Sequence, residues 1–308
     1  MDKFPLMVKK SVSLAGLSTF SIGGKVDNLV EIKNRNGLLT SLSYFKKNKI
    51  SFKVFAEGSN IVFPDKGING FLIRLINGSV YKIGNEIVSD AGVTLTKLIN
   101  FSIKNGLSGL EKLSGIPGSV GGAVVGNAGA YGISVSDIIQ EVECWDNGKI
   151  YWLTNADSRF RYRDSIFKHK PFVIVSVRFR LKKSSYDSLR KTSLEIISIR
   201  EKKYKPGLKC PGSFFKNIIV ADLKKTVIER IGFENIKYGK IPAGFLLEKV
   251  GACGMSVGDI EIASFHGNLF YNKGKGKSEE VKKLAGILKA KVYKKFGTFL
   301  EEEIRYFL

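Results

Sequence analysis

A glycine-rich stretch is the first candidate for chemistry. It spans residues 113–136 (LSGIPGSVGGAVVGNAGAYGISVS) and contains no charged residue. Its seven glycines are Gly115, Gly118, Gly121, Gly122, Gly126, Gly129 and Gly132. Glycine permits positive φ angles and close approach to the backbone, and consecutive N–H groups on a loop or helix start attract anions. The composition therefore favours an anion-binding loop over its alternative, a tightly packed turn in a core.

Other interpretations of this stretch are weaker. Pro117, Asn127 and the glycines oppose the stable apolar helix that a membrane span of about 20 residues requires. Neither GxGxxG after a strand nor GxxxxGK[ST] is present, so a Rossmann or P-loop site is not supported.

A second cluster, FRYRDSIFK at residues 160–168, places aromatic and cationic side chains on a connection. A rigid guanidinium fork such as that of Arg163 suits recognition of a carboxylate. Taken alone, the pattern is more typical of a surface ion-pair cluster.

A third cluster, KCPGSFFKN at residues 209–217, contains two possible reactive groups. Ser213 has no neighbouring His and Asp motif, which makes it a poor nucleophile, and Cys210 is the more reactive type of side chain. The alternative is a tight turn before an apolar strand.

Three segments resemble the UDP-N-acetylenolpyruvoylglucosamine reductases, also called UDP-N-acetylmuramate dehydrogenases. SGIPGSVGGAVVGNAGAYG is similar to their flavin-binding signature, AEGSNIVF (residues 56–63) to their GGGSN-type flavin loop, and STFSIGG (residues 18–24) to their TFRIGG. The resemblance implies non-covalent FAD binding. The implied cofactor residues are Gly58, Ser59, Asn60, Gly115, Ile116, Pro117, Gly118, Gly121, Gly122, Asn127, Ala128, Gly129 and Ala130.

The same resemblance implies the catalytic groups. YRDSIFK is similar to the family motif whose arginine, here Arg163, binds and polarises the substrate carboxylate. GSFFKN resembles the motif whose serine, here Ser213, protonates the substrate carbon. FLEEEIRYFL at the end of the chain resembles L-x-P-E-V-R-x-x-G, which places the family glutamate on Glu303. The implied substrate-binding residues are Tyr162, Arg163, Lys205 and Asn217, and no metal site is expected.

The chain departs from the family pattern at several positions. Ser21 stands where arginine is usual, and Glu57 replaces a glycine beside the expected pyrophosphate. Glu302 replaces proline near the C-terminus. His266 is one of only two histidines, so a three-histidine metal site is excluded, and we interpret it as structural or peripheral.

Composition limits the class of protein. The chain has 308 residues, 44% of them hydrophobic, and a net charge of +22, as expected for a globular protein of two or three domains. The basic residues are scattered, and no nucleic-acid motif occurs, so the charge is expected to help steer anionic nucleotides. Three cysteines without metal-ligand spacing and no signal peptide predict a reduced, cytoplasmic setting. We expect no nucleic-acid partner, no membrane insertion and a monomer.

Periodicity predicts the elements that position these groups. A strand at 26–33, a helix after Asn36 and a strand at 52–55 form a β-α-β opening. A helix at 94–105 precedes the glycine-rich stretch, and a hairpin turns at 146–148. A buried strand ends near 181, and helices follow from 186 to 203, at 241–251 and after Ser278, the last one ending at Gly297.

These observations predict an α+β protein: a two-lobed FAD-binding region of the PCMH/VAO type, with lobes at 1–76 and 77–183, and an α+β substrate-binding domain at 184–308. The resemblance implies that NADPH reduces FAD and that a hydride then passes to C3 of UDP-N-acetylglucosamine-enolpyruvate, giving UDP-N-acetylmuramate. A different FAD oxidase sharing the flavin lobe and a basic nucleic-acid-binding protein are the alternatives.

Overall fold

The computed structural model describes residues 6–205 and 207–307 and divides into two compact units, each with its own hydrophobic core. Unit 1 comprises residues 6–12, 26–57 and 69–202, and unit 2 comprises residues 13–25, 58–68 and 203–307.

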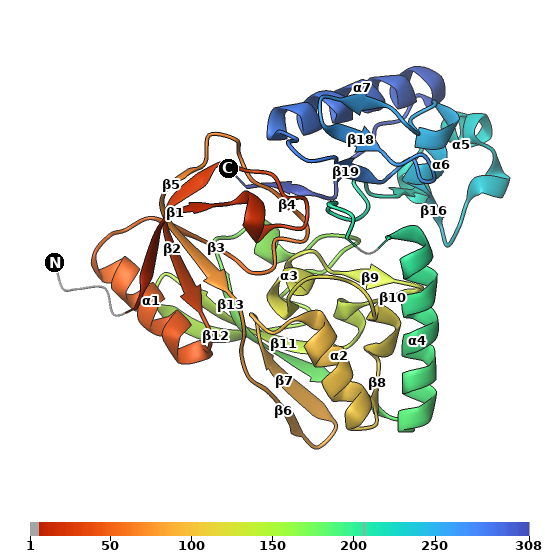
Figure 1. Cartoon of the computed structure of the whole chain (residues 1–308). Coiled ribbons are helices and arrows are strands. Elements are labelled where there is room, and N and C mark those ends of the chain that lie inside the picture. Colours follow the sequence, from red (N-terminus) through yellow and green to blue (C-terminus); the bar gives the residue numbers. More distant parts are fainter. Residues whose placement is uncertain (1–5, 206, 308) are drawn as a thin grey trace. The chain divides into compact units, whose positions relative to one another are not determined.

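Five antiparallel strands form the larger sheet of unit 1, in the order β12-β11-β13-β7-β6 (Figure 1). Their bounds are β6 Val80–Ile83, β7 Glu86–Asp90, β11 Ile139–Asp146, β12 Lys149–Thr154 and β13 Val173–Arg180. Asp146 pairs with Lys149, and Asn147 and Gly148 between them have φ angles of 44° and 90°. Positive φ at both central residues is the geometry that Asn-Gly favours in a two-residue hairpin, so the predicted hairpin is confirmed.

A smaller sheet has the order β1-β2-β5-β3, with β3 parallel to β5. Its strands are β1 Val8–Ser13, β2 Lys25–Ile32, β3 Phe52–Phe55 and β5 Ile68–Leu75, and helix α1 (Arg35–Lys47) connects β2 to β3. The predicted β-α-β opening is confirmed, but α1 begins before Asn36. The reason is an N-cap: the side chain of Asn34 accepts a hydrogen bond from the Gly37 N–H at 2.8 Å, which satisfies a free donor of the first turn.

One helix of unit 1 precedes the glycine-rich segment and another lies within it. Helix α2 (Leu95–Lys104) is capped by Thr94, and Gly106 follows it with a φ of 63°. Helix α3 (Val120–Val125) lies within the glycine-rich stretch. The remaining short strands are β8 Leu107–Ser108, β9 Gly129–Ala130, β10 Ile133–Ser134 and β14 Lys182–Lys183.

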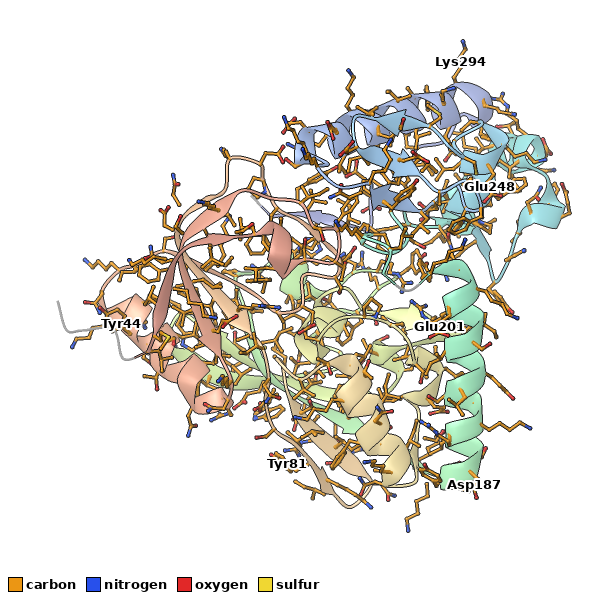
Figure 2. All side chains as sticks on the ribbon, in the orientation of Figure 1. Tyr44, Tyr81, Asp187, Glu201, Glu248 and Lys294 are labelled. Carbon is orange, nitrogen blue, oxygen red and sulfur yellow. The ribbon has the colours of Figure 1, made fainter. Side chains whose placement is uncertain are left out.

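Helix α4 (Tyr186–Lys203) runs between the labelled side chains of Asp187 and Glu201 in Figure 2. Leu189 of α4 belongs to the core of unit 1. The predicted boundary at residue 184 differs from this division, and the assignment of three functional domains stays a prediction. Proline ends helices because it lacks a backbone N–H, and Pro206, which follows this helix in the sequence, lies outside the described residues.

Unit 2 is built around helix α7 (Ser278–Phe296), which buries Val281, Leu284, Leu288 and Val292 and ends at Gly297 with a φ of 74°. A left-handed glycine is a common helix terminator. The other elements are α5 Lys225–Ile231, α6 Ala243–Lys249, the pair β15 Ile218–Ile219 and β16 Lys240–Ile241, and the sheet β17 Ser256–Val257, β18 Ile260–Ile262 and β19 Phe270–Asn272.

One strand pair of unit 2 joins distant parts of the chain. Strand β4 (Ile61–Val62) pairs in parallel with β20 (Arg305–Tyr306), so that Arg305 lies opposite Ile61. Strand β20 is therefore held beside the loop that contains Asn60. Among the described residues, no helix combines the length and apolar character needed to cross a membrane.

Candidate active site

The glycines of the glycine-rich stretch fall into two kinds. Gly121 is buried, and a Cβ there would lie 3.0 Å from the Cβ of Ala91, so this glycine allows close packing. Gly122 is exposed, and its nearest neighbour would be Ser119 Oγ at 3.3 Å. Gly126, four residues later on the same helical face, would meet nothing closer than 3.6 Å. Gly122 and Gly126 therefore present bare backbone that another molecule can approach.

Asn127 fixes the end of this stretch. It is buried and has a φ of 41°. Its amide nitrogen donates to the Arg161 carbonyl at 2.9 Å, and its amide oxygen accepts from the Ser136 N–H at 3.2 Å. The side chain thus holds the loop in shape, and a direct cofactor contact by Asn127 stays a prediction.

Arg163 is attached to the glycine-rich stretch. One terminal nitrogen donates to the Gly129 carbonyl at 2.7 Å and the other to the Asn127 carbonyl at 3.4 Å. The ring of Tyr162 lies 5.4 Å from the guanidinium carbon. Unit 1 therefore brings together Tyr162, Arg163 and the predicted flavin loop.

The backbone at Arg163 is strained, with a φ of 54°. The left-handed region costs a bulky residue roughly 1–2 kcal/mol, and such strain concentrates at functional sites. The turn is fastened by mutual backbone bonds of 3.0 and 3.1 Å between Arg161 and Asp164. Burial tends to raise the pKa of Asp164. Its hydrogen bond to His169, together with electrostatic attraction to His169 and Lys168, outweighs burial, so the pKa is lowered overall.

The loop that carries Gly58, Ser59 and Asn60 belongs to unit 2. Gly58 has a φ of 64°, and a Cβ there would lie only 2.4 Å from the Leu17 carbonyl oxygen, so glycine is required. Thr19 contacts the same loop, since its hydroxyl donates to the Ser59 carbonyl at 3.3 Å. The two segments that resemble TFRIGG and GGGSN are thus adjacent.

The Ser213 segment and the C-terminus also meet in unit 2. The Glu303 N–H donates to the Phe214 carbonyl at 2.8 Å, and the Asn60 side chain donates to the Glu303 carbonyl at 3.0 Å. On the other side of the segment, the Phe214 N–H donates to the Asn268 carbonyl at 3.0 Å. Ser213, Glu303 and Asn60 are therefore carried by adjoining segments.

Packing fixes the orientation of the Ser213 segment. Phe214 and Phe215 are buried, and the ring of Phe214 stacks on Phe270 with centroids 3.8 Å apart. Asn268 holds the segment through both ends of its amide, which bond to the N–H and carbonyl of Phe215 at 2.8 and 2.9 Å. Ser213 itself is only partly buried, so its hydroxyl lies at the edge of this rigid core.

The three C-terminal glutamates have different surroundings. Glu301 is exposed and pairs with Lys216. Glu302 pairs with Lys289 at 2.6 Å. Glu303 is half-buried, and its backbone is bonded to Phe214 and Asn60. This arrangement supports Glu303 as the candidate glutamate.

The other predicted substrate contacts lie in unit 2. Asn217 is exposed, and its side-chain oxygen accepts from the Ala243 N–H at the start of α6, at 3.1 Å. Lys205 is exposed, with its ammonium 4.9 Å from the ring centroid of Phe265. Their roles toward a substrate stay predictions.

Cys210 and His266 fit poorly as reactive groups. Burial raises the pKa of the Cys210 thiol, which disfavours the thiolate that reacts as a nucleophile. Burial and the nearby Lys203 lower the pKa of His266, whose ring packs against Gly244 and lies 3.4 Å from Glu248 (labelled in Figure 2). Among the described residues, no cluster of His, Cys, Asp and Glu could hold a metal ion.

A separate pocket of about 560 Å³ opens in unit 1. Its lining includes Asp90, Trp152 and Tyr81, the last of which is labelled in Figure 2. Arg35 and Glu143 in the lining form a two-point ion pair of 3.0 and 2.5 Å. None of the candidate site residues lines this pocket, so it is distinct from the candidate site.

Sequence reasoning missed Tyr204 and undervalued Asn268. The Tyr204 hydroxyl lies 2.9 Å from Ser213 Oγ, and Asn268 fastens the segment that follows Ser213. Periodicity places Tyr204 at the end of a helix and gives no signal for this contact. The HGN run that contains Asn268 was the available signal for that residue.

Two family models and several known reductases are similar to this chain. Residues 204–307 match the model for the C-terminal domain of UDP-N-acetylenolpyruvoylglucosamine reductase, and residues 26–154 match an FAD binding domain. The reductase of Solibacter usitatus is 35% identical over 302 residues, which cover 98% of this chain and 97% of the relative. That of Anoxybacillus flavithermus is 31% identical, with 96% and 93% covered.

A solved structure extends the match to three dimensions. The UDP-N-acetylenolpyruvylglucosamine reductase of Thermus caldophilus is similar with a TM-score of 0.76 and 27% identity, over 98% of this chain and 100% of that one. The fold and the flavin-binding domain define an FAD-dependent oxidoreductase of α+β architecture. The chain belongs to the UDP-N-acetylenolpyruvoylglucosamine reductase family.

Proposed function

We propose that this protein reduces UDP-N-acetylglucosamine-enolpyruvate to UDP-N-acetylmuramate with NADPH as hydride donor, a step in peptidoglycan precursor synthesis. One observation carries the proposal: hydrogen bonds connect the Asn60 loop, the Glu303 segment and the Ser213 segment. These segments are far apart in the sequence, and an unrelated substrate would not require the GSFFKN and EIR sequences beside a flavin loop.

The chain's residues fit FAD. The open glycines Gly122 and Gly126 allow a pyrophosphate to approach the backbone, and the glycine-rich stretch around them contains no charged residue. Gly58, Ser59 and Asn60 would hold another part of the cofactor. When bound, FAD supplies the hydride chemistry that side chains do not provide.

Arg163 is proposed to bind the substrate carboxylate. Carbonyl oxygens of Asn127 and Gly129 fix its two terminal nitrogens. A guanidinium presents five N–H donors in a fixed planar fork whose geometry matches a carboxylate. A cation held in place in this way stabilises negative charge that develops on the substrate without having to reorganise.

Ser213 is proposed to donate a proton to C2 of the substrate, and Glu303 to act beside it on the developing charge. The stacked rings of Phe214 and Phe270 hold the serine backbone in position. Such positioning matters because proton transfer requires the donor to lie within hydrogen-bond reach of the accepting atom.

Tyr162, Lys205 and Asn217 are proposed to bind other parts of the nucleotide-sugar. The net charge of +22 favours the approach of anionic substrates. Because UDP-sugars and NADPH are cytoplasmic metabolites, we propose that the protein acts in the cytoplasm.

The test is an NADPH oxidation assay with and without the enolpyruvyl nucleotide-sugar. The proposal expects oxidation that depends on this substrate and yields UDP-N-acetylmuramate. A protein that carries flavin but passes electrons only to another acceptor would instead be a different FAD oxidoreductase.

A further inference from the structure

Tyr204 contacts the proposed proton donor. It follows the last residue of α4, and its hydroxyl oxygen lies 2.9 Å from Ser213 Oγ. Both side chains are half-buried and both belong to unit 2. The backbone around Ser213 is fixed, because Ser213 forms an antiparallel β-bridge with Leu269 and the Phe214 N–H donates to the Asn268 carbonyl.

The hydroxyl pair can be arranged in two ways, since either oxygen can be the donor. If Ser213 donates to Tyr204, the serine proton points at the tyrosine and is not available to a substrate. If Tyr204 donates to Ser213, the serine keeps its own proton free to point elsewhere. Each hydroxyl has a single hydrogen, so only the second arrangement leaves Ser213 able to act as an acid.

We propose that Tyr204 is a positioning residue that directs and replenishes the proton of Ser213. The inference rests on the proposed function, in which Ser213 protonates the substrate carbon. In the step, the serine O–H bond breaks and a substrate C–H bond forms. The tyrosine proton moves to the serine oxygen, and water returns a proton to the tyrosine. The net change is one proton from solvent added to the substrate carbon.

The donated hydrogen bond also stabilises the serine oxygen while its proton leaves. A hydrogen bond to a charged oxygen is stronger than one to a neutral hydroxyl, so the contribution of Tyr204 grows as the proton is transferred. An interaction that strengthens in the transition state raises the rate of the step rather than the affinity for substrate.

The test uses the flavin-loaded protein and the variant Tyr204→Phe, which removes only the hydroxyl. Stopped-flow spectra follow flavin bleaching by NADPH and recovery on adding the enolpyruvyl nucleotide-sugar. We expect an unchanged bleaching rate and an unchanged substrate KM, with recovery slowed about tenfold, as for loss of one hydrogen bond in the transition state. Tyr271→Phe is the matched control, because it removes a phenol that bonds Glu261 at 2.7 Å in the same unit.

A double-mutant cycle with Ser213→Ala separates positioning from general scaffolding. If Tyr204 acts through Ser213, the double variant recovers at the rate of Ser213→Ala alone. If the effects of the two substitutions multiply, or Tyr204→Phe recovers normally, the inference about Tyr204 is overturned while the proposed function stands.

Other outcomes would overturn other claims. Normal recovery in Ser213→Ala would remove the serine from the acid role, and the inference about Tyr204 with it, although the reaction itself would be intact. No recovery in the unmodified protein would overturn the proposed function. Tyr204→His, which restores an N–H donor, should recover part of the rate lost in Tyr204→Phe, and a histidine variant no faster than phenylalanine would contradict the inference.

Discussion

The Glu303 N–H donates to the carbonyl oxygen of Phe214 over 2.8 Å, so the end of the chain lies beside the residue that follows Ser213. The bond orients the backbone of one candidate catalytic group relative to that of another. Because the Asn60 side chain donates to the Glu303 carbonyl, the predicted flavin loop is tied to the same segment.

We expect Asn60→Ala to lower the free energy of unfolding by about 1 kcal/mol, the usual worth of one hydrogen bond, and to lower activity further by releasing the Glu303 segment. Asn28→Ala is the control, since Asn28 donates to the Gly70 carbonyl at 3.1 Å in unit 1. Urea unfolding and steady-state rates would be compared. Equal losses of activity in both variants would show that Asn60 acts only through stability.

Glu303→Gln and Glu302→Gln should separate the charge proposed to act in the site from a charge held in an ion pair. We expect Glu303→Gln to slow turnover about 10²-fold or more, as for loss of a group that acts in the transition state. Glu302→Gln removes an ion pair with Lys289 and alters a hydrogen bond to Tyr306, so it should lower stability while activity is retained. A reversed pattern in kcat would move the family glutamate to Glu302.

Two neighbouring glycines should respond differently to alanine. Gly121→Ala places a methyl group 3.0 Å from the Ala91 Cβ and should destabilise the protein without flavin, because a packed core resists added volume. Gly122→Ala faces open space beyond Ser119 Oγ and should change that stability little while weakening flavin binding. Thermal unfolding of the flavin-free protein and fluorescence titration with FAD would measure both. Unchanged FAD affinity in Gly122→Ala would place the pyrophosphate elsewhere.

His266 should make stability depend on pH. Burial, with Lys203 nearby, lowers its pKa in the folded state below the ordinary 6.5. The unfolded chain therefore binds a proton first as the pH falls through about 6.5, so stability decreases from there down to the folded pKa. We expect His266→Asn to flatten the plot of unfolding free energy against pH in this window. The same slope in both proteins would contradict this assignment.

Local signals were sufficient for much of the fold. Asn147-Gly148 predicted the β11–β12 hairpin through its positive φ angles, and the apolar spacing with Gly297 predicted α7. The two-residue pairing of β4 with β20 was not predicted, because strands this short carry no periodicity and their partners are more than 240 residues apart in the sequence.

The candidate site was predicted through its segments rather than through its contacts. The sequence marked Gly58 and Gly121 as positions of close approach because they are glycines in family-like loops. In the structure, neighbouring atoms fill the space that a side chain would need there. The contact of Tyr204 with Ser213 depends on where the chain runs after α4, and no pattern of residue types encodes that path. The strained φ of Arg163 was equally invisible in the sequence.

The most direct test of the proposed reaction follows the flavin through both half-reactions in Ser213→Ala and the unmodified protein. We expect equal bleaching by NADPH in both, rapid recovery on adding UDP-N-acetylglucosamine-enolpyruvate to the unmodified protein, and recovery slower by about 10²- to 10⁴-fold in the variant. UDP-N-acetylmuramate should accumulate in step with recovery. Absence of this product, or a flavin that the enolpyruvyl substrate does not reoxidise in the unmodified protein, would contradict the proposed reaction.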